Sequence, residues 1–99
     1  MNRYITAGVS ERIPLDVQIL CWNAYEQTKL NGAYDYLQVF KLTEMKEDGG
    51  GFNCVLTHDT EEPEYHMSYK LRLDGGGISE KFYIIDSVEY EMMLLAEEY

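Results

Sequence analysis

Residues 64–73, EYHMSYKLRL, decide the fold class because apolar and polar side chains alternate along them without a break. One side of the extended chain carries Tyr65, Met67, Tyr69, Leu71 and Leu73. The other side carries His66, Ser68, Lys70 and Arg72. A period of two with one apolar side is typical of an antiparallel strand that has one face on the core. The stretch therefore predicts a half-buried antiparallel strand.

Residues 14–31, PLDVQILCWNAYEQTKLN, predict the one long helix. Pro14 fits the first turn, where a missing N–H costs nothing, and Gly32 is the expected stop. An apolar stripe at helical spacing predicts the face that packs on the sheet, made of Ile13, Val17, Leu20, Cys21, Ala24 and Thr28. Leu15, Ile19 and Trp22 project to another side, so either a second layer or a partner is expected to cover Trp22.

The remaining segments predict a sheet for this helix to cover. Five stretches are rich in aromatic and β-branched residues and predict strands, at 3–9, 35–46, 52–58, 81–86 and 90–98. The last stretch is also apolar enough to form a helix instead. Turns are predicted at 47–51, 75–77 and 87–89, the first two from their glycine triplets.

The order β-α-β-β-β-β-β predicts an α+β fold with one long helix packed on a mostly antiparallel sheet of five to six strands. A chain of 99 residues has room for one core, so residues 1–99 are expected to form a single domain.

The charge balance restricts the classes of partner. Eighteen Asp and Glu residues against eight Lys and Arg residues give a net charge of −10. Such a charge opposes direct binding to nucleic acid and to anionic membranes, and it attracts a basic protein surface. Solubility alone is the alternative explanation.

No apolar run approaches the roughly 20 residues of a membrane span, and no signal peptide precedes the first predicted strand. A cytoplasmic location is therefore expected, with Cys21 and Cys54 as free thiols.

The segment HDTEEPEYH, residues 58–66, holds both histidines and is the candidate metal site. If it forms a hairpin with its tip at Thr60–Pro63, His58 and His66 face each other, and a neighbouring carboxylate or Cys54 could complete a zinc site. On a strand, Cys54 and His58 share a face but lie about 13 Å apart. Histidines on a solvated strand edge are the alternative interpretation.

Catalytic motifs are absent from the sequence. Cys54, His58 and Asp59 have the residue types of a nucleophilic site, but strand spacing separates the thiol from the imidazole. Neither glycine triplet has the spacing of a phosphate-binding loop. We therefore expect a protein that is not an enzyme.

Five segments taken in order form a pattern: RYIT…G, IPLDVQ…W, DYLQVFKL, H…EEPEY and YIID…MLLAEEY. The pattern resembles a small family of uncharacterised proteins from Gram-positive bacteria and their phages, domain-of-unknown-function family 960. The chain departs from it at Ala7, at Ser87 and in an expanded turn at 49–51. The resemblance implies no activity, but it suggests the genome of a phage or another mobile element as one home.

Binding is the remaining class of function, and the acids supply its candidate residues. The predicted acidic patch consists of two blocks. The first block is Asp59, Glu61, Glu62 and Glu64, and the second block is Asp86, Glu89, Glu91, Glu97 and Glu98. The aromatic contact residues are Trp22, Tyr65 and Tyr90, because Trp and Tyr are enriched in interfaces.

The leading hypothesis is a non-enzymatic, acidic interaction protein of phage or mobile-element type. Its most specific form is an anti-CRISPR inhibitor that occupies the basic nucleic-acid channel of a type II, Cas9-like effector. Two alternatives remain: a cytoplasmic bacterial protein that forms a homodimer through the Trp22 face, and a module stabilised by zinc.

Overall fold

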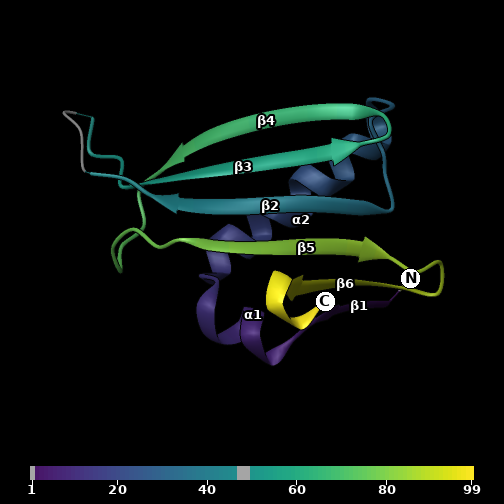
Figure 1. Ribbon diagram of the computed structural model, residues 1–99, viewed down its shortest axis with the longest axis horizontal. Helices are drawn as coiled ribbons and strands as arrows, with labels where there is room; N and C mark the ends of the chain where they lie inside the picture. The colour runs from purple at the N-terminus through teal and green to yellow at the C-terminus, as the bar shows by residue number, and fades with distance from the viewer. Residues whose placement is uncertain (1, 47–49) are drawn as a thin grey trace.

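The computed structural model describes residues 2–46 and 50–99 as one sheet with helices on one side (Figure 1). The elements are β1 (Asn2–Ile5), α1 (Ala7–Arg12), α2 (Leu15–Leu30), β2 (Leu37–Glu44), β3 (Cys54–Glu61), β4 (Glu64–Leu71), β5 (Glu80–Asp86), β6 (Tyr90–Leu95) and the 3₁₀ turn η1 (Ala96–Glu98). Within these described ranges, no helix has the length and apolar character needed to span a membrane.

The sheet has six strands in the order β1-β6-β5-β2-β3-β4. Every neighbouring pair is antiparallel except β1 and β6, which run parallel. The prediction of an α+β fold with one long helix on a mostly antiparallel sheet is therefore confirmed. The strand predicted from 64–73 is β4, and it lies at one edge of the sheet.

The predicted strand at 3–9 is wrong in its second half. The chain leaves the sheet after Ile5, and Ala7–Arg12 form the short helix α1. Thr6 is the N-cap of this helix, and its hydroxyl accepts a hydrogen bond from the Val9 N–H at 3.2 Å. A Thr side chain that satisfies a free N–H of the first turn favours a helix start.

Residues 90–98, predicted as either a strand or a helix, form a strand over most of their length. Tyr90–Leu95 form β6, which pairs with β5 across the predicted turn at 87–89, and a single 3₁₀ turn follows. Of the predicted glycine turn at 47–51, residues 47–49 lie outside the described residues. Gly76 in the second triplet has φ of +97°, a value that disfavours other residues.

Helix α2 covers one face of the sheet, and the predicted stripe is the face that it presents. Val17, Cys21, Ala24 and Thr28 are buried, as is Ile13 just before the helix, while Leu20 is half-buried. Tyr25 and Gln18 are also buried, although the stripe did not include them. The sheet contributes Phe40, Leu42, Leu56, Phe82, Ile84 and Met93 to the same core.

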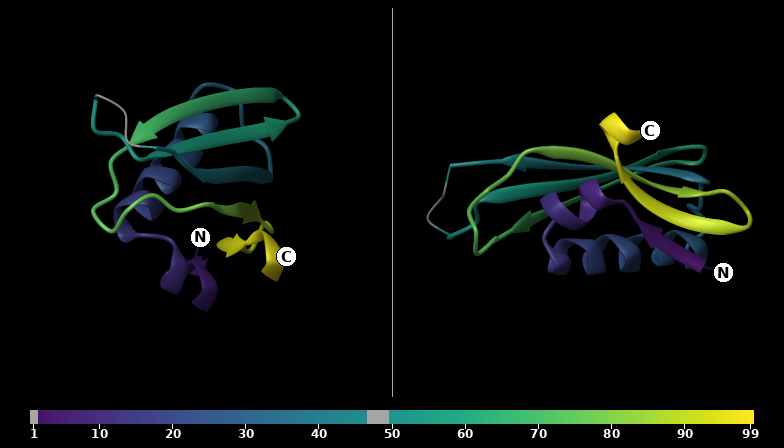
Figure 2. Two further views of the ribbon diagram at one scale, coloured as in Figure 1. Left: turned by 60° about the vertical axis from the view of Figure 1, so that its left-hand side comes forward. Right: turned by 90° about the horizontal axis from the view of Figure 1, so that it is seen from below.

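The opposite face of the sheet is open over most of its area. Figure 2 shows α2 on one side of the sheet and the C-terminal turn η1 on the other. The ring of Tyr99 packs edge-on against Tyr83 at 5.2 Å between centroids, so η1 covers part of β5 on this side. We call this side the open face.

Candidate partner-binding site

The β3–β4 hairpin organises the candidate site. Glu61 pairs with Glu64, so the turn lies at the predicted tip of 60–63, and the Thr60 hydroxyl donates to the Pro63 carbonyl at 2.6 Å. Asp35, at the entry to β2, accepts hydrogen bonds from the N–H groups of Glu61 and Glu62 at 3.4 and 3.2 Å. This carboxylate therefore fixes the end of the hairpin against β2.

A hollow of about 580 Å³ lies between the hairpin and the start of β2. We call it the acidic cavity, and it is lined by Asp35, Tyr36, Leu37, Val39, Asp59, Thr60, Glu61, Glu62 and Lys81. Four carboxylates and one ammonium group thus line it. The Tyr36 ring stands at its side with 66% of the residue exposed. A cation is the ligand group that suits such a lining, through ion pairs and the face of the ring.

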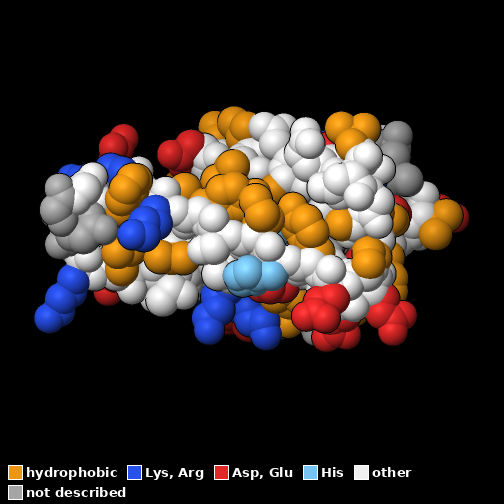
Figure 3. All heavy atoms as spheres, turned by 90° about the horizontal axis from the view of Figure 1, so that it is seen from above, with side chains coloured by type: hydrophobic (Ala, Val, Ile, Leu, Met, Phe, Trp, Pro, Cys, Tyr) orange, Lys and Arg blue, Asp and Glu red, His pale blue; other side chains and the backbone are white. Residues whose placement is uncertain are grey.

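More acids extend the negative charge along the same end of the sheet. The Asp86 N–H donates to the Tyr36 carbonyl at 2.8 Å, so the end of β5 lies beside the entry to β2. Glu89 is exposed in the turn that follows. Figure 3 shows acidic side chains gathered at the end of the molecule where the β3–β4 turn lies. The first predicted block and the start of the second therefore share one end.

The prediction of Glu91 as a surface acid is wrong, because Glu91 is only 2% exposed. Its carboxylate accepts hydrogen bonds from Arg3 at 2.8 Å, Tyr25 at 2.6 Å and Lys29 at 3.0 Å. Burial alone would raise the pKa of Glu91, but these donors outweigh it and lower the pKa to about 2. The cluster joins β6 to β1 and α2, a structural role.

Glu97 and Glu98 do not join the acidic end either. Glu97 forms an ion pair with Arg12 of α1. The Glu98 carboxylate accepts hydrogen bonds from the Thr6 hydroxyl at 2.6 Å and the Leu95 N–H at 2.8 Å. Both acids tie η1 to neighbouring elements, so the second predicted block is divided.

The predicted metal ligands do not converge. His58 pairs with Met67 and His66 pairs with Asp59, so the two imidazoles point to opposite faces of the sheet. His58 is fully buried and bonds through Nε2 to the Gln38 side chain at 2.7 Å, whereas His66 is exposed and contacts Asp59 at 2.5 Å. The Cys54 thiol donates to the Ile78 carbonyl. Among the described residues, no three His, Cys, Asp or Glu side chains are placed to hold a metal ion.

Cys21 and Cys54 are both buried free thiols, as predicted.

The three predicted aromatic contact residues are all half-buried. Trp22 packs against the core, and the Arg3 guanidinium lies 4.6 Å from the centre of its ring. Tyr65 meets the His58 ring edge-on, and Tyr90 meets Tyr4. The exposed aromatic ring at the site is instead Tyr36.

Asp35 and Lys81 are the charged site residues that the sequence did not single out. Asp35 is the first residue of the strand predicted at 35–46, but it lies in the loop before β2, where an acid is a common residue. Its contact with the hairpin depends on how β2 aligns with β3, and this alignment follows from the folded core.

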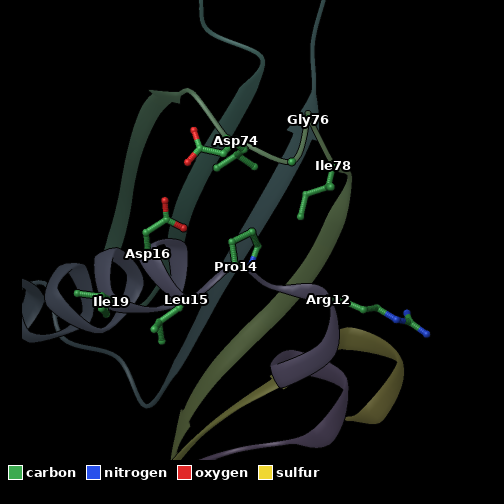
Figure 4. A pocket seen from close by; sticks show the side chains of 10 residues that line it. Arg12, Pro14, Leu15, Asp16, Ile19, Asp74, Gly76 and Ile78 are labelled. Carbon is green, nitrogen blue, oxygen red and sulfur yellow. The ribbon is translucent and has the colours of Figure 1, made fainter.

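A second hollow of about 530 Å³ lies at the start of α2, beside the loop after β4 (Figure 4). Leu15, Ile19 and Ile78 supply apolar walls, while Asp16 and Asp74 lie on the same side of it. A helix N-terminus attracts anions, but these two carboxylates oppose an anionic ligand there. The chemistry of this hollow is therefore less defined than that of the acidic cavity.

Comparison with known proteins supports the fold. A solved structure described as a protein of unknown function from Enterococcus faecalis superposes with a TM-score of 0.74 at 20% sequence identity, over 99% of this chain and 90% of that one. At this identity the similarity shows the fold alone. No curated protein matches the sequence. A family model described as "Staphylococcal protein of unknown function (DUF960)" matches residues 2–98. The chain therefore belongs to the DUF960 family.

Proposed function

We propose that this chain is a small, non-enzymatic binding protein whose acidic cavity receives a lysine or arginine side chain of a basic partner protein. The observation that supports this proposal is the placement of Asp35, Asp59, Glu61 and Glu62 around one hollow. The bacterial cytoplasm is its proposed place of action.

The long-range and short-range electrostatics of the molecule act together. A net charge of −10 speeds the encounter with a basic partner, and the cavity then offers a local set of carboxylates. The positive charge of Lys81 repels a cation in the cavity. Its ammonium nitrogen lies 5.8 Å from the centre of the Tyr83 ring. Removing this charge should therefore strengthen the binding of a basic ligand.

The most specific form of the proposal is an anti-CRISPR inhibitor that binds the basic channel of a Cas9-type effector and blocks nucleic-acid loading. Small size and acidity support it, since such channels contact nucleic acid through Lys and Arg. Competition between this protein and guide RNA for a purified Cas9-type nuclease tests this form. Undiminished RNA loading would reject the inhibitor and leave other basic partners.

An NMR titration of the ¹⁵N-labelled protein with an octa-arginine peptide locates the binding site. We expect the largest shift changes at residues 35–36 and 59–62, and tighter binding by Lys81→Gln. An octa-glutamate peptide is the control for unspecific effects and should cause no changes. Shift changes spread evenly over exposed acids, or centred on α1, would contradict the proposed site.

A further inference from the structure

The edge strand β4 has a sequence that is complementary to itself when reversed. Around Met67 the residues are Glu64, Tyr65 and His66 on one side, and Ser68, Tyr69 and Lys70 on the other. An antiparallel copy centred on Met67 places Glu64 opposite Lys70 and Tyr65 opposite Tyr69, each twice. We propose that β4 pairs with β4 of a second copy of this chain about a two-fold axis through Met67.

The alternation of backbone hydrogen bonds fits this register. The Asp86 N–H donates to the Tyr36 carbonyl, so the backbone groups of Tyr36 point towards β5. Because backbone groups alternate in direction along a strand, those of Phe40, four residues later, also point towards β5. His58 lies opposite Phe40, so its backbone groups point away from β2 and towards β4. Met67 lies opposite His58, so its backbone groups point back towards β3. Residues 66 and 68 therefore direct their N–H and C=O groups outward. In the proposed register, residue 66 of one copy faces residue 68 of the other, so these groups bond to each other.

The side chains along this edge suit a covered position. Met67 is 41% exposed, and Tyr65 and Tyr69 beside it are half-buried on the same face. Figure 3 views the molecule from the β4 side and shows hydrophobic side chains in a band along it. An uncovered edge strand with apolar side chains is a template for pairing with another strand.

Charge complementarity points to a second copy as the occupant. The hairpin end of β4 is acidic, with Glu62 and Glu64, and its other end is basic, with Lys70 and Arg72. Antiparallel pairing brings the acidic end of each copy to the basic end of the other. The resulting assembly is a continuous sheet with both α2 helices on one side. This inference does not depend on the proposed function.

A single cysteine at the two-fold axis tests the register. Residues directly opposite in a non-hydrogen-bonded antiparallel pair have Cα atoms about 4.5 Å apart, within the range of a disulfide. Met67→Cys should therefore form a covalent dimer in a glutathione redox buffer, whereas Ser68→Cys, one residue away on the same exposed edge, should remain monomeric. The native cysteines are buried and serve as internal controls. Equal cross-linking of the two variants would overturn the register.

Charge exchange tests the same interface without oxidation. In sedimentation velocity, Lys70→Glu should dissociate the dimer because it places a carboxylate opposite Glu64 of the other copy at both ends of the interface. The double variant Glu64→Lys with Lys70→Glu should restore the dimer. A wild-type protein that is monomeric at high concentration would overturn the proposal. So would a dimer that survives Lys70→Glu but dissociates with Trp22→Glu, because its interface would be the helix.

Discussion

The Glu91 carboxylate links three elements, because it lies on β6 and contacts side chains of β1 and α2. The carboxylate is buried, accepts a hydrogen bond from the Tyr25 hydroxyl and forms ion pairs with Arg3 and Lys29. Hydrogen bonds to charged groups contribute about 1.5–3 kcal/mol each when one partner is removed. We predict that Glu91→Gln lowers the free energy of unfolding by about 2–3 kcal/mol, measured by urea denaturation at neutral pH.

The same residue predicts an acid-sensitive step. Because the folded chain lowers the pKa of Glu91 to about 2 from its ordinary 4.5, the unfolded chain binds the proton first. Its contribution is present above pH 4.5 and is lost as the pH falls towards 2, by up to about 3 kcal/mol. Glu91→Gln should lack this step. An equally steep acid transition in the variant would show that other carboxylates cause it.

His58 predicts a separate step at higher pH. Burial lowers its pKa to about 4, against a smaller opposite effect from the charge of Asp59. The unfolded chain therefore takes up a proton near pH 6.5 while the folded chain does not. We predict that stability falls between pH 6.5 and 4, by up to about 3 kcal/mol, and that His58→Gln flattens the curve there. The control is His66→Gln, which removes the exposed imidazole; if this variant flattens the curve instead, the assignment is wrong.

Individual residues were the hardest features to predict from the sequence. Asp86, Glu89 and Glu91 follow each other within six positions, yet only Glu91 is buried. The alternation of β6 places Glu91 on the face with Met93 and Leu95, and Arg3 approaches it from β1. That parallel pairing joins residues 88 positions apart, which local patterns do not reveal.

At the scale of elements, local patterns predicted the sheet and the long helix but not the register. Alternation in 64–73 and the stripe on 14–31 both follow from contact with one core, so they gave β4 and the buried side of α2 correctly. The convergence of His58 and His66 that was expected for a metal site at 58–66 was wrong, because the hairpin turns between Glu61 and Glu64. This register puts His58 and His66 on opposite faces, and a shift by one residue would have reversed the result.

The loop before β5 gives an element-scale prediction. A Cβ atom on Gly77 would lie 2.3 Å from the Asn53 carbonyl oxygen, which is fixed backbone at the start of β3. Gly77→Ala should therefore lower the melting temperature and cost about 1–3 kcal/mol of stability. Gly75→Ala is the matched control, since nothing lies within 4 Å of its added Cβ atom. Equal stability of the two variants would contradict the close approach of this loop to β3.

At the scale of the whole molecule, the net charge of −10 was evident from composition, but its distribution was not. Glu91, Glu97 and Glu98 of the second predicted block are held in contacts away from the acidic end, while Asp86 at this end accepts a hydrogen bond from the Tyr34 hydroxyl. The β3–β4 hairpin and the ends of β2 and β5 gather the others at one end of the sheet. The proposed binding function depends on this gathering rather than on the total charge.

The most direct test of that claim separates position from charge. Glu61→Lys with Glu62→Lys alters the acidic cavity, and Glu11→Lys with Glu44→Lys alters exposed acids on α1 and at the far end of β2. Each double variant changes the net charge by four, from −10 to −6. The measurement is calorimetric titration of octa-arginine into the wild type and both variants, at low and physiological salt. We predict that the cavity variant loses affinity by about tenfold or more, or about 1.4 kcal/mol, while the control variant stays near the wild type. Equal losses in the two variants would mean that the peptide responds to net charge alone, and would contradict a binding site in the acidic cavity.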